Sequence, residues 1–530
     1  LPEDLAELAL FNNTQATMMG YSSPASMRRA QAQAAALAKV HVPGAGGTWQ
    51  RVSNGILDER DPAYPAGGYG NTLLAGRISN YSLADDGTVY AGVANGGVWR
   101  SQDSGRSWTD ISRTLPTQIV GAIGWTRGGG PHGTLMALTG DNSFGQYNWS
   151  GSGLFWSTDE GRHWHHAQGI PSGLLAFKVQ VAPDSPSTVY AATGNGLFRS
   201  DDAGRSFRNV ELPTVSGCTQ TRNFFQEKCA LSSVVTDVIV RGKDSFGHTG
   251  GAVVAAVGWR AGDQENADGT PQAPANGLYT SETGKPGSFT KLPDSSGFAP
   301  AANVGRVSFG NAYGPDQDHD YLYALVQDAK LLQQGGVEVV PDEFGNGVTS
   351  NNIVSYVNGA YVSDDFGQTW TLMEDTTGFT SQTTGSSLAA IEALGIAPGV
   401  QAWYNNWIQP DPYEQVGGIP TNVMLGMEEI WQTGTRGVPQ VGRTDFRVVA
   451  PYAGGTYGCV LVGNACSLGL QTTGLTSAHP DQHAVLFLPP ADGSLTREIL
   501  AGSDGGNYVA EMPPAGLLKQ TDFVAAQDGF

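Results

Sequence analysis

The sequence predicts an all-β protein, a β-propeller of seven four-stranded blades with a short helical extension at its N-terminus. The main observation is a pattern, SxDxGxxW, that returns at intervals along the chain. Each copy also follows a short run with the aromatic and β-branched content of a strand. The composition agrees, since 73 of 530 residues are glycine and only 15% are charged. The clear copies of the pattern are residues 101–108, 157–164 and 363–370, and residues 200–207, where Phe207 replaces the tryptophan.

The chemistry of the pattern fits a tight turn between the third and fourth strands of a blade. Serine and aspartate side chains can hydrogen-bond the backbone of their own turn, and glycine adopts positive φ readily. The aromatic residue then covers the turn. These copies resemble the Asp-box, or BNR, repeat of sialidases, two-propeller xyloglucanases and sortilin-type receptors. The resemblance implies the propeller fold and does not by itself imply one activity.

The blades can be assigned in chain order from their strand-like runs. Five blades contain the pattern or a degraded copy of it, and two further blades lack it; six or eight blades remain alternatives. An insertion between Asp328 and Ile353 in blade 5 predicts a hairpin or a long loop. The predicted inner strands begin near residues 76, 119, 176, 235, 304, 405 and 483.

The chain divides into three regions. Residues 1–45 form an N-terminal extension with a helix predicted over 23–40, where Ala, Gln, Arg and Leu dominate. Residues 46–514 form the propeller, and we expect the segment 49–53 to complete the last blade, since propellers often close with one terminus. Residues 515–530 are not needed for that closure and could open a further region of a longer chain.

The net charge and the cysteine pairs of the chain limit its possible partners and indicate its compartment. The formal net charge is −20, which argues against nucleic acid and anionic membranes as partners. No long apolar run suggests membrane insertion. Because the chain begins at Leu1, we expect that a leader was removed or left out. Two close cysteine pairs, Cys218 with Cys229 and Cys459 with Cys466, predict local disulfides and a secreted or extracellular protein, with free thiols as the alternative.

Propeller geometry indicates where a site belongs. The SxDxGxxW turns face one side of the disc, whereas loops that enter inner strands or join second to third strands face the other, around the central channel. On that side His479, Asp481 and His483 alternate in an extended segment, so their side chains can converge on one metal or substrate. Neighbouring loops of the last two blades and the first add more candidates: Asp504, Glu428, Trp403, Tyr404, Asn405, Arg77 and Asn95.

This group suits more than one role. With Asp481, Asp504 and Glu428 as acid and base, assisted by His479 and His483, it resembles a glycosidase site with aromatic side chains stacking on sugars. His479, Asp481 and His483 could instead hold a divalent metal, calcium or zinc. In a purely structural role, the aspartates cap turns and the histidines pack. A second set, Asp316, Asp318 and Asp320, has the spacing of a calcium loop or of an ordinary turn.

Comparison with known families narrows the activity. The Arg-Ile-Pro motif of sialidases is absent, because Ile78 is followed by Ser79, and Ala94 stands where an aspartate of the xyloglucanases is expected. The chain is similar to secreted bacterial glycosyl-hydrolase-like propeller proteins, which share the WYN, HPDQHA and DGG stretches. The resemblance covers most of residues 45–510 and does not itself give a reaction. Because ionisable and aromatic residues converge on one face, we expect a carbohydrate-active, glycoside hydrolase-like protein that cleaves a polysaccharide at the channel mouth. The alternative is a non-catalytic propeller that binds glycan or protein, with a partner chain from the same precursor.

Overall fold

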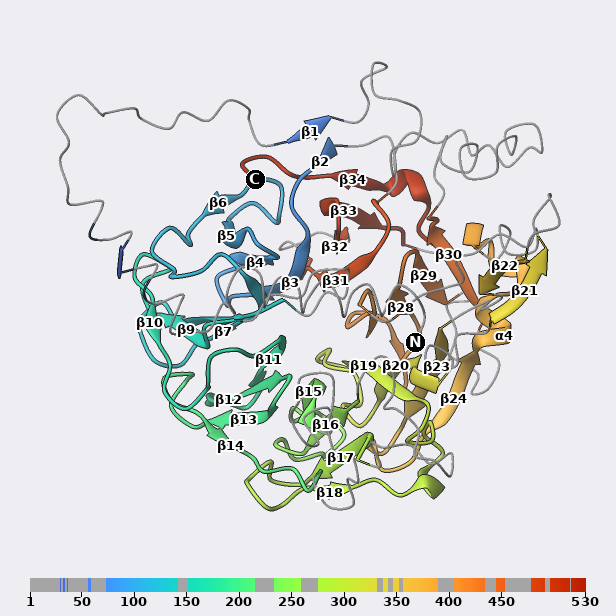
Figure 1. The fold of residues 1–530 in the computed structure, drawn as a ribbon, viewed down its shortest axis with the longest axis horizontal. Coiled ribbons are helices and arrows are strands. Elements are labelled where there is room, and N and C mark those ends of the chain that lie inside the picture. The colour runs from blue at the N-terminus through green and yellow to red at the C-terminus, as the bar shows by residue number, and fades with distance from the viewer. Residues whose placement is uncertain are drawn as a thin grey trace.

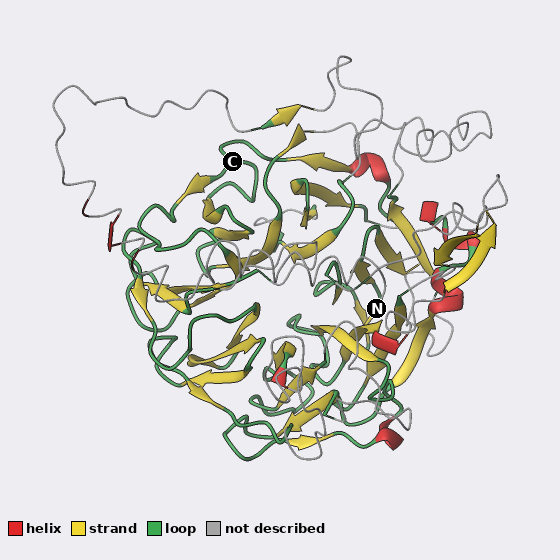
Figure 2. Cartoon of the chain, in the orientation of Figure 1, coloured by secondary structure: helices red, strands yellow, loops and turns green. Residues whose placement is uncertain are grey.

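A computed structural model shows a seven-bladed β-propeller. It describes residues 56–58, 73–141, 151–214, 233–258, 275–330, 337–341, 347–351, 356–388, 402, 404–433, 445–452, 478–490, 496–514 and 516–530, together with residues 29, 32, 33 and 36. In the described residues, seven antiparallel sheets of four strands follow one another along the chain. Figure 1 shows them arranged around a central axis, and Figure 2 shows how few of the described residues are helical. The predicted fold class is confirmed.

Each blade has its strands in chain order from the axis outward. Blade 1 consists of β3 (Ile78–Leu83), β4 (Val89–Val93), β5 (Gly97–Ser101) and β6 (Thr109–Asp110). Blade 2 consists of β7 (Val120–Thr126), β8 (Thr134–Thr139), β9 (Leu154–Ser157) and β10 (His165–His166). Blade 3 consists of β11 (Ala176–Ala182), β12 (Ser185–Thr193), β13 (Gly196–Ser200) and β14 (Arg208–Asn209). Blades 4 and 5 are β15 (Val235–Val240), β16 (Val253–Val257), β17 (Gly277–Ser281), β18 (Thr290–Lys291); and β19 (Val304–Asn311), β20 (Leu322–Asp328), β23 (Val357–Ser363), β24 (Thr371–Asp375). Blades 6 and 7 are β25 (Trp407–Pro410), β28 (Val423–Gly426), β29 (Ile430–Thr433), β30 (Phe446–Ala450); and β31 (Gln482–Phe487), β32 (Arg497–Ser503), β33 (Gly506–Met512), β34 (Phe523–Ala525).

Short strand pairs and helical turns lie outside the seven four-stranded sheets in the described residues. The strand pairs outside the blades are β1 (Leu57–Asp58) with β2 (Leu73–Leu74), β21 (Val337–Pro341) with β22 (Gly347–Asn351), and β26 (Gln415–Val416) with β27 (Ile419–Pro420). The helical turns are η2 (Asp294–Ser296), α4 (Thr376–Phe379), η3 (Gln382–Thr384) and η5 (Gln520–Asp522). The hairpin of β21 and β22 lies in the insertion of blade 5, where a hairpin or loop was predicted. No helix in the described residues is long and apolar enough to cross a membrane.

The core lies between neighbouring blades. Apolar side chains of blade 4, such as Val254 and Leu278, pack with Phe309 and Leu322 of blade 5. Inner strands are further joined by side chains that bond the backbone of the next blade, as Asn80 does with both the N–H and the carbonyl of Ile123 at 3.0 Å. Burial and these bonds together keep the blades in register around the axis.

The repeated turns have the predicted geometry. In the first copy, the Ser101 hydroxyl donates to Asp103 and accepts the Gly105 N–H at 2.9 Å. Asp103 also accepts the Ser107 N–H at 2.8 Å, and the Trp108 indole donates to the Gly105 carbonyl at 3.1 Å. Gly105 has φ +80°, a conformation that glycine adopts without strain. The turn is a structural staple that satisfies its own polar groups.

The last blade closes differently from the expectation. Its fourth strand is β34, from the C-terminal segment, which pairs with β33 through Val509 opposite Val524. The prediction that this segment is not needed for closure is therefore wrong. Beyond β34, the Trp108 N–H donates to the Asp528 carbonyl at 2.7 Å, and Phe530 packs against the Trp99 ring with centroids 4.9 Å apart. Figure 1 shows this end of the chain beside β6 of blade 1.

Several sequence predictions fall outside the described residues. The segment 49–53, which was expected in the last blade, is among them. So are most of the helix predicted over 23–40 and all the residues of the two predicted disulfides, Cys218, Cys229, Cys459 and Cys466. The disulfides and the N-terminal extension stay predictions.

Candidate functional site at the channel mouth

The inner strands of all seven blades line a central cavity of about 380 Å³. Its wall is rich in polar and charged side chains, as expected where inner-strand side chains point toward a solvent-filled axis. At one end of it lie Arg77, Arg306 and His483, and the Lys178 ammonium pairs with Asp237 across blades 3 and 4 at 2.8 Å. The cavity places ionisable groups from distant parts of the chain next to one another.

The segment that enters β31 is fixed by its backbone. The Asp481 N–H donates to the Glu428 carbonyl at 3.1 Å, and the Asp504 N–H donates to the Asp481 carbonyl at 3.1 Å. Asp481 has φ +66°, a left-handed conformation that aspartate and asparagine tolerate better than most residues. The entry loop of blade 7 therefore joins the β28–β29 turn of blade 6 to the β32–β33 turn of its own blade.

The two carboxyl groups at this junction, those of Asp481 and Asp504, have pKa values that are displaced in opposite directions. Burial, together with the negative charge of Asp504, raises the pKa of Asp481 to about 7. Burial alone would also raise the pKa of Asp504, but the neighbouring His483 and Arg77 hold it below its ordinary value. At neutral pH, Asp504 is a carboxylate and Asp481 is close to half protonated.

A chain of polar contacts orients Asp504. Nε2 of His483 lies 2.7 Å from Asp504 Oδ1, so the ring nitrogen donates to the carboxylate. Burial lowers the pKa of His483, whose side chain is only 5% exposed, so the imidazole is neutral near pH 7. The Arg77 guanidinium lies 3.7 Å from the same oxygen and 3.2 Å from Asp141. Asp504 is thus held between a neutral imidazole and a cation.

Blade 6 supplies the partners of Asp481. Asn405 Nδ2 donates to Asp481 Oδ1 at 2.9 Å, and the Tyr404 hydroxyl also hydrogen-bonds this carboxyl group. Burial and the nearby Asp481 charge raise the pKa of Tyr404 far above its ordinary value, so the phenol keeps its proton. The Tyr404 ring lies 5.7 Å from that of His483, and the Tyr404 carbonyl accepts a hydrogen bond from Arg306.

The adjacent glutamates have different environments. Glu428 is 1% exposed and lies close enough for its charge to raise the pKa of the Tyr404 phenol. Glu429 points elsewhere, because its carboxylate accepts hydrogen bonds from the hydroxyls of Ser386 and Ser387 at 2.6 and 2.7 Å and from the Tyr452 N–H at 2.9 Å. Glu429 thus anchors loops of blade 6, and Glu428 borders the candidate site.

The structure brings most, but not all, of the predicted residues together. Arg77, Tyr404, Asn405, Asp481, His483 and Asp504 form one contact network, with Glu428 beside it. His479 lies at its edge, where Nδ1 contacts the Pro480 carbonyl at 2.9 Å and burial lowers its pKa. Asn95 is at the exposed β4–β5 turn, outside the described contacts of the network. Trp403 lies outside the described residues, and the metal role of His479, Asp481 and His483 stays a prediction.

Sequence reasoning missed two members of the site. Arg306, 8% exposed, comes from β19, and Asp141 follows β8 of blade 2. A signal existed for each: an arginine inside a buried inner strand, VGRVSFG, and an aspartate directly after a second strand on the channel side. The charges of both Asp141 and Asp237 act on Arg306, whose pKa burial lowers to about 10.

Comparisons with known proteins find only distant likeness, among solved structures. No protein-family model matches the sequence, and no curated protein sequence matches it. Among solved structures, the chain is similar to an ancestral GH74 enzyme, at 13% identity and a TM-score of 0.47 over 87% of this chain and 47% of that one. The GH74 xyloglucanase of Xanthomonas campestris matches at 14% identity and a TM-score of 0.47, over 87% and 55%.

A third structure belongs to another kind of protein. YCF48 from Cyanidioschyzon merolae matches at 11% identity and a TM-score of 0.38, over 83% of this chain and 97% of that one. The present chain spans about half the length of the two GH74 structures. Since one fold hosts many functions, likeness at this level carries no argument about activity.

Proposed function

We propose that the chain is a secreted carbohydrate-active protein, glycoside hydrolase-like, that cleaves a polysaccharide at the channel mouth. The observation that carries this proposal is the pair Asp481 and Asp504, neighbouring carboxyl groups whose pKa values are displaced in opposite directions. Glycoside hydrolysis needs one carboxylic acid to protonate the leaving oxygen and one carboxylate to act as base or nucleophile.

The surrounding residues fit these roles. Asp481, with its raised pKa, would donate the proton, and Tyr404 and Asn405 would orient its carboxyl group. Asp504 would stay ionised because His483 and Arg77 stabilise its charge. Trp403 and Tyr404 would offer aromatic surfaces on which sugar rings stack. An acidic chain with a net charge of −20 suits a neutral polysaccharide better than a polyanion.

The proposal can be tested on a panel of neutral polysaccharides, with new reducing ends as the measure of cleavage. The wild-type chain should release products from at least one polymer, and Asp481→Asn should lower the rate by about 10²-fold or more. Asp364→Asn is a matched control, because Asp364 is exposed in a turn on the opposite face of the disc. Full activity in Asp481→Asn would exclude this residue as the acid.

A non-catalytic glycan- or protein-binding propeller is the alternative. The observation that favours it is that the central side chains are buried against one another: His483 is 5% exposed, and Asp481 is held by both Asn405 and Tyr404. Such contacts also suit residues that only shape a rigid loop. The same panel separates the two functions if bound polymer is measured beside products. Binding without any product supports the alternative.

A further inference from the structure

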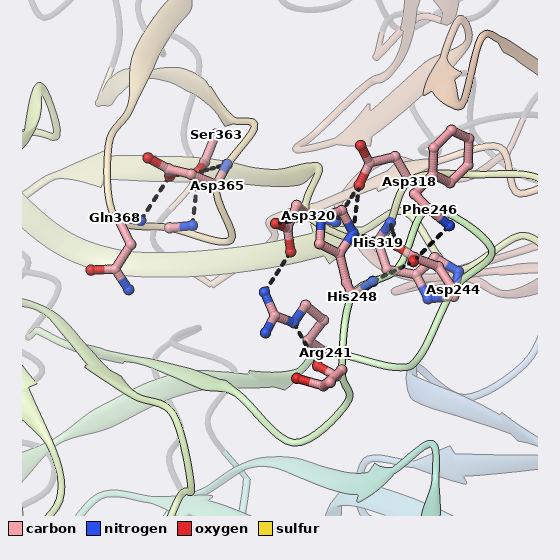
Figure 3. A network of polar contacts seen from close by, with 12 residues as sticks. Arg241, Asp244, Phe246, His248, Asp318, His319, Asp320, Ser363, Asp365 and Gln368 are labelled. Carbon is pink, nitrogen blue, oxygen red and sulfur yellow. Dashed lines mark hydrogen bonds and ion pairs between the residues drawn. The ribbon is translucent and has the colours of Figure 1, made fainter.

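A second cluster of ionisable side chains lies on the face of the SxDxGxxW turns, away from the channel mouth. It joins two loops that are far apart in sequence: Asp244 and His248 lie between β15 and β16 of blade 4, and Asp318 and Asp320 lie between β19 and β20 of blade 5. Figure 3 shows the His248 ring among the three carboxyl groups, with the turn of Ser363 and Asp365 nearby. The proposed hydrolase activity uses none of these residues.

Three potential ligand atoms in this cluster converge. His248 Nδ1 lies 2.7 Å from Asp244 Oδ2 and 3.2 Å from Asp318 Oδ1, and all three lie within 4.8 Å of one another. Ligands about 2.1 Å from a tetrahedral zinc ion are about 3.4 Å apart, so small shifts admit an ion between them. The Asp244 side chain is fully buried, whereas those of His248 and Asp318 are 30% and 23% exposed. An ion could therefore enter from solvent.

A separate feature concerns the other nitrogen of the ring. His248 Nε2 lies 3.2 Å from Asp320 Oδ2, and Arg241 pairs with Asp320 Oδ1 at 2.6 Å. Histidine ligands of metals typically donate their second N–H to a carboxylate, which fixes the ring and its tautomer. Asp320 and Arg241 supply this outer arrangement, although neither is one of the converging atoms.

The loop that carries the first two residues is also ordered around Asp244. Asp244 Oδ1 accepts the N–H groups of Phe246 and His248 at 3.0 and 2.9 Å, and Oδ2 accepts the His319 N–H at 2.9 Å. These bonds hold the carboxylate in place from both loops. Little conformational entropy is then lost when the group binds an ion.

We propose that Asp244, His248 and Asp318 bind a divalent transition-metal ion of the zinc class. One imidazole and two carboxylates suit zinc, with water in the remaining position, whereas calcium prefers six to eight oxygen ligands. The ion ties blade 4 to blade 5. The loop that carries Asp318 also contacts blade 6, because the Asp318 N–H donates to the Gly418 carbonyl of the β26–β27 hairpin at 2.9 Å. The role of the ion is structural.

The proposal replaces the calcium loop considered for Asp316, Asp318 and Asp320. Asp316 is exposed, and the cluster's described contacts do not include it. His248 was not predicted as a ligand, because it comes from another blade and is far from the three aspartates in sequence. Asp316 therefore offers a matched control two residues from a proposed ligand.

The test uses the full chain, freed of metal with a chelator and dialysed against Zn²⁺. Metal content by mass spectrometry should show a bound ion that Asp318→Asn and His248→Ala lose, with affinity at least about 10-fold weaker. Asp316→Asn should bind as wild type does. Zinc should also raise the wild-type Tm and slow amide hydrogen exchange in residues 241–251 and 312–321.

The exchange measurement keeps the test valid if a variant folds poorly, because it uses the wild-type chain alone. Zinc protection confined to those two loops supports the proposal. The proposal is wrong if zinc leaves both loops unprotected, or if the three variants bind zinc alike, as expected when His248 serves only as an ion-pair partner of the carboxylates. Calcium uptake without zinc uptake would also overturn it.

Discussion

Asp481 is the residue on which the proposed function depends, and its environment makes a prediction about stability. Its pKa is raised from 3.8 to about 7 in the folded chain. Between pH 3.8 and about pH 7, the folded protein holds a proton on Asp481 that the unfolded chain has released. The free energy of unfolding therefore includes a contribution that is present at acid pH and is lost as pH rises toward about 7.

Replacing Asp481 with asparagine should remove this pH dependence. Asn keeps the shape, tolerates the positive φ and can accept the hydrogen bond from Asn405. We expect Asp481→Asn to be more stable than wild type above about pH 7, where the buried carboxylate must be charged in the wild-type protein. Urea unfolding of both proteins at pH values below and above about 7 measures this difference in the free energy of unfolding. A wild-type advantage that grows above that pH would contradict the assignment.

Residue chemistry was partly visible in the sequence. The alternation in His479, Asp481 and His483 pointed to the right loop, because an entry into an inner strand faces the channel in any propeller. It did not indicate that His483 turns to Asp504 while Asp481 turns to Asn405. The expectation that the alternating side chains share one face assumed an extended backbone throughout. Asp481 has a positive φ instead, and this turn of the backbone separates its side chain from that of His483.

At the scale of elements, β34 is the clearest departure from expectation. Residues 49–53 were expected to form the fourth strand of blade 7, because WQRVS resembles the segment that follows the first repeated turn. The short run FVA in β34 has weak strand character of its own. Its pairing with β33 and the packing of Phe530 on blade 1 are tertiary effects that a local pattern does not reveal.

The role of β34 makes a mutational prediction. Phe523 is 1% exposed in the core of blade 7, and its neighbour Val524 is 58% exposed. Phe523→Ala should lower the free energy of unfolding by about 3–5 kcal/mol, the usual effect of deleting a buried phenyl group. Val524→Ala in the same strand should change it by no more than about 0.5 kcal/mol. Denaturant titration measures both, and equal effects would mean that β34 does not close the core.

At the scale of the whole molecule, the repeated turn was the most informative feature. It marked five of the seven blades, one of them by a degraded copy, and it also predicted which face of the disc carries the channel-side loops. The sequence located the site to that face and indicated most of its members, although these come from blades 1, 2, 5, 6 and 7. Asp141 joins it through its ion pair with Arg77 of blade 1, and closure of the ring places β3 beside β31. Arg306 of blade 5 joins it through the adjacent blade 6, where it donates to the Tyr404 carbonyl. No spacing in the sequence encodes such neighbours.

Two faces with different chemistry emerge from this arrangement. The channel mouth holds the proposed acid and base, and the turn face holds the proposed zinc site on blades 4 and 5. Variants of one cluster should leave the other unchanged, since effects of distant, independent sites usually add. Zinc binding by Asp481→Asn and its loss in Asp318→Asn therefore distinguish failure of one proposal from failure of the other.

The central claim is that Asp481 keeps a proton up to about pH 7, whereas Asp504 is a carboxylate there. Infrared difference spectra between wild type and Asp481→Asn measure this directly, because a protonated carboxyl group absorbs apart from a carboxylate. At about pH 6, the wild-type protein should show a protonated carboxyl band that the variant lacks, and the band should fade toward about pH 8. Absence of that band at about pH 6 would contradict the claim and remove the proposed acid.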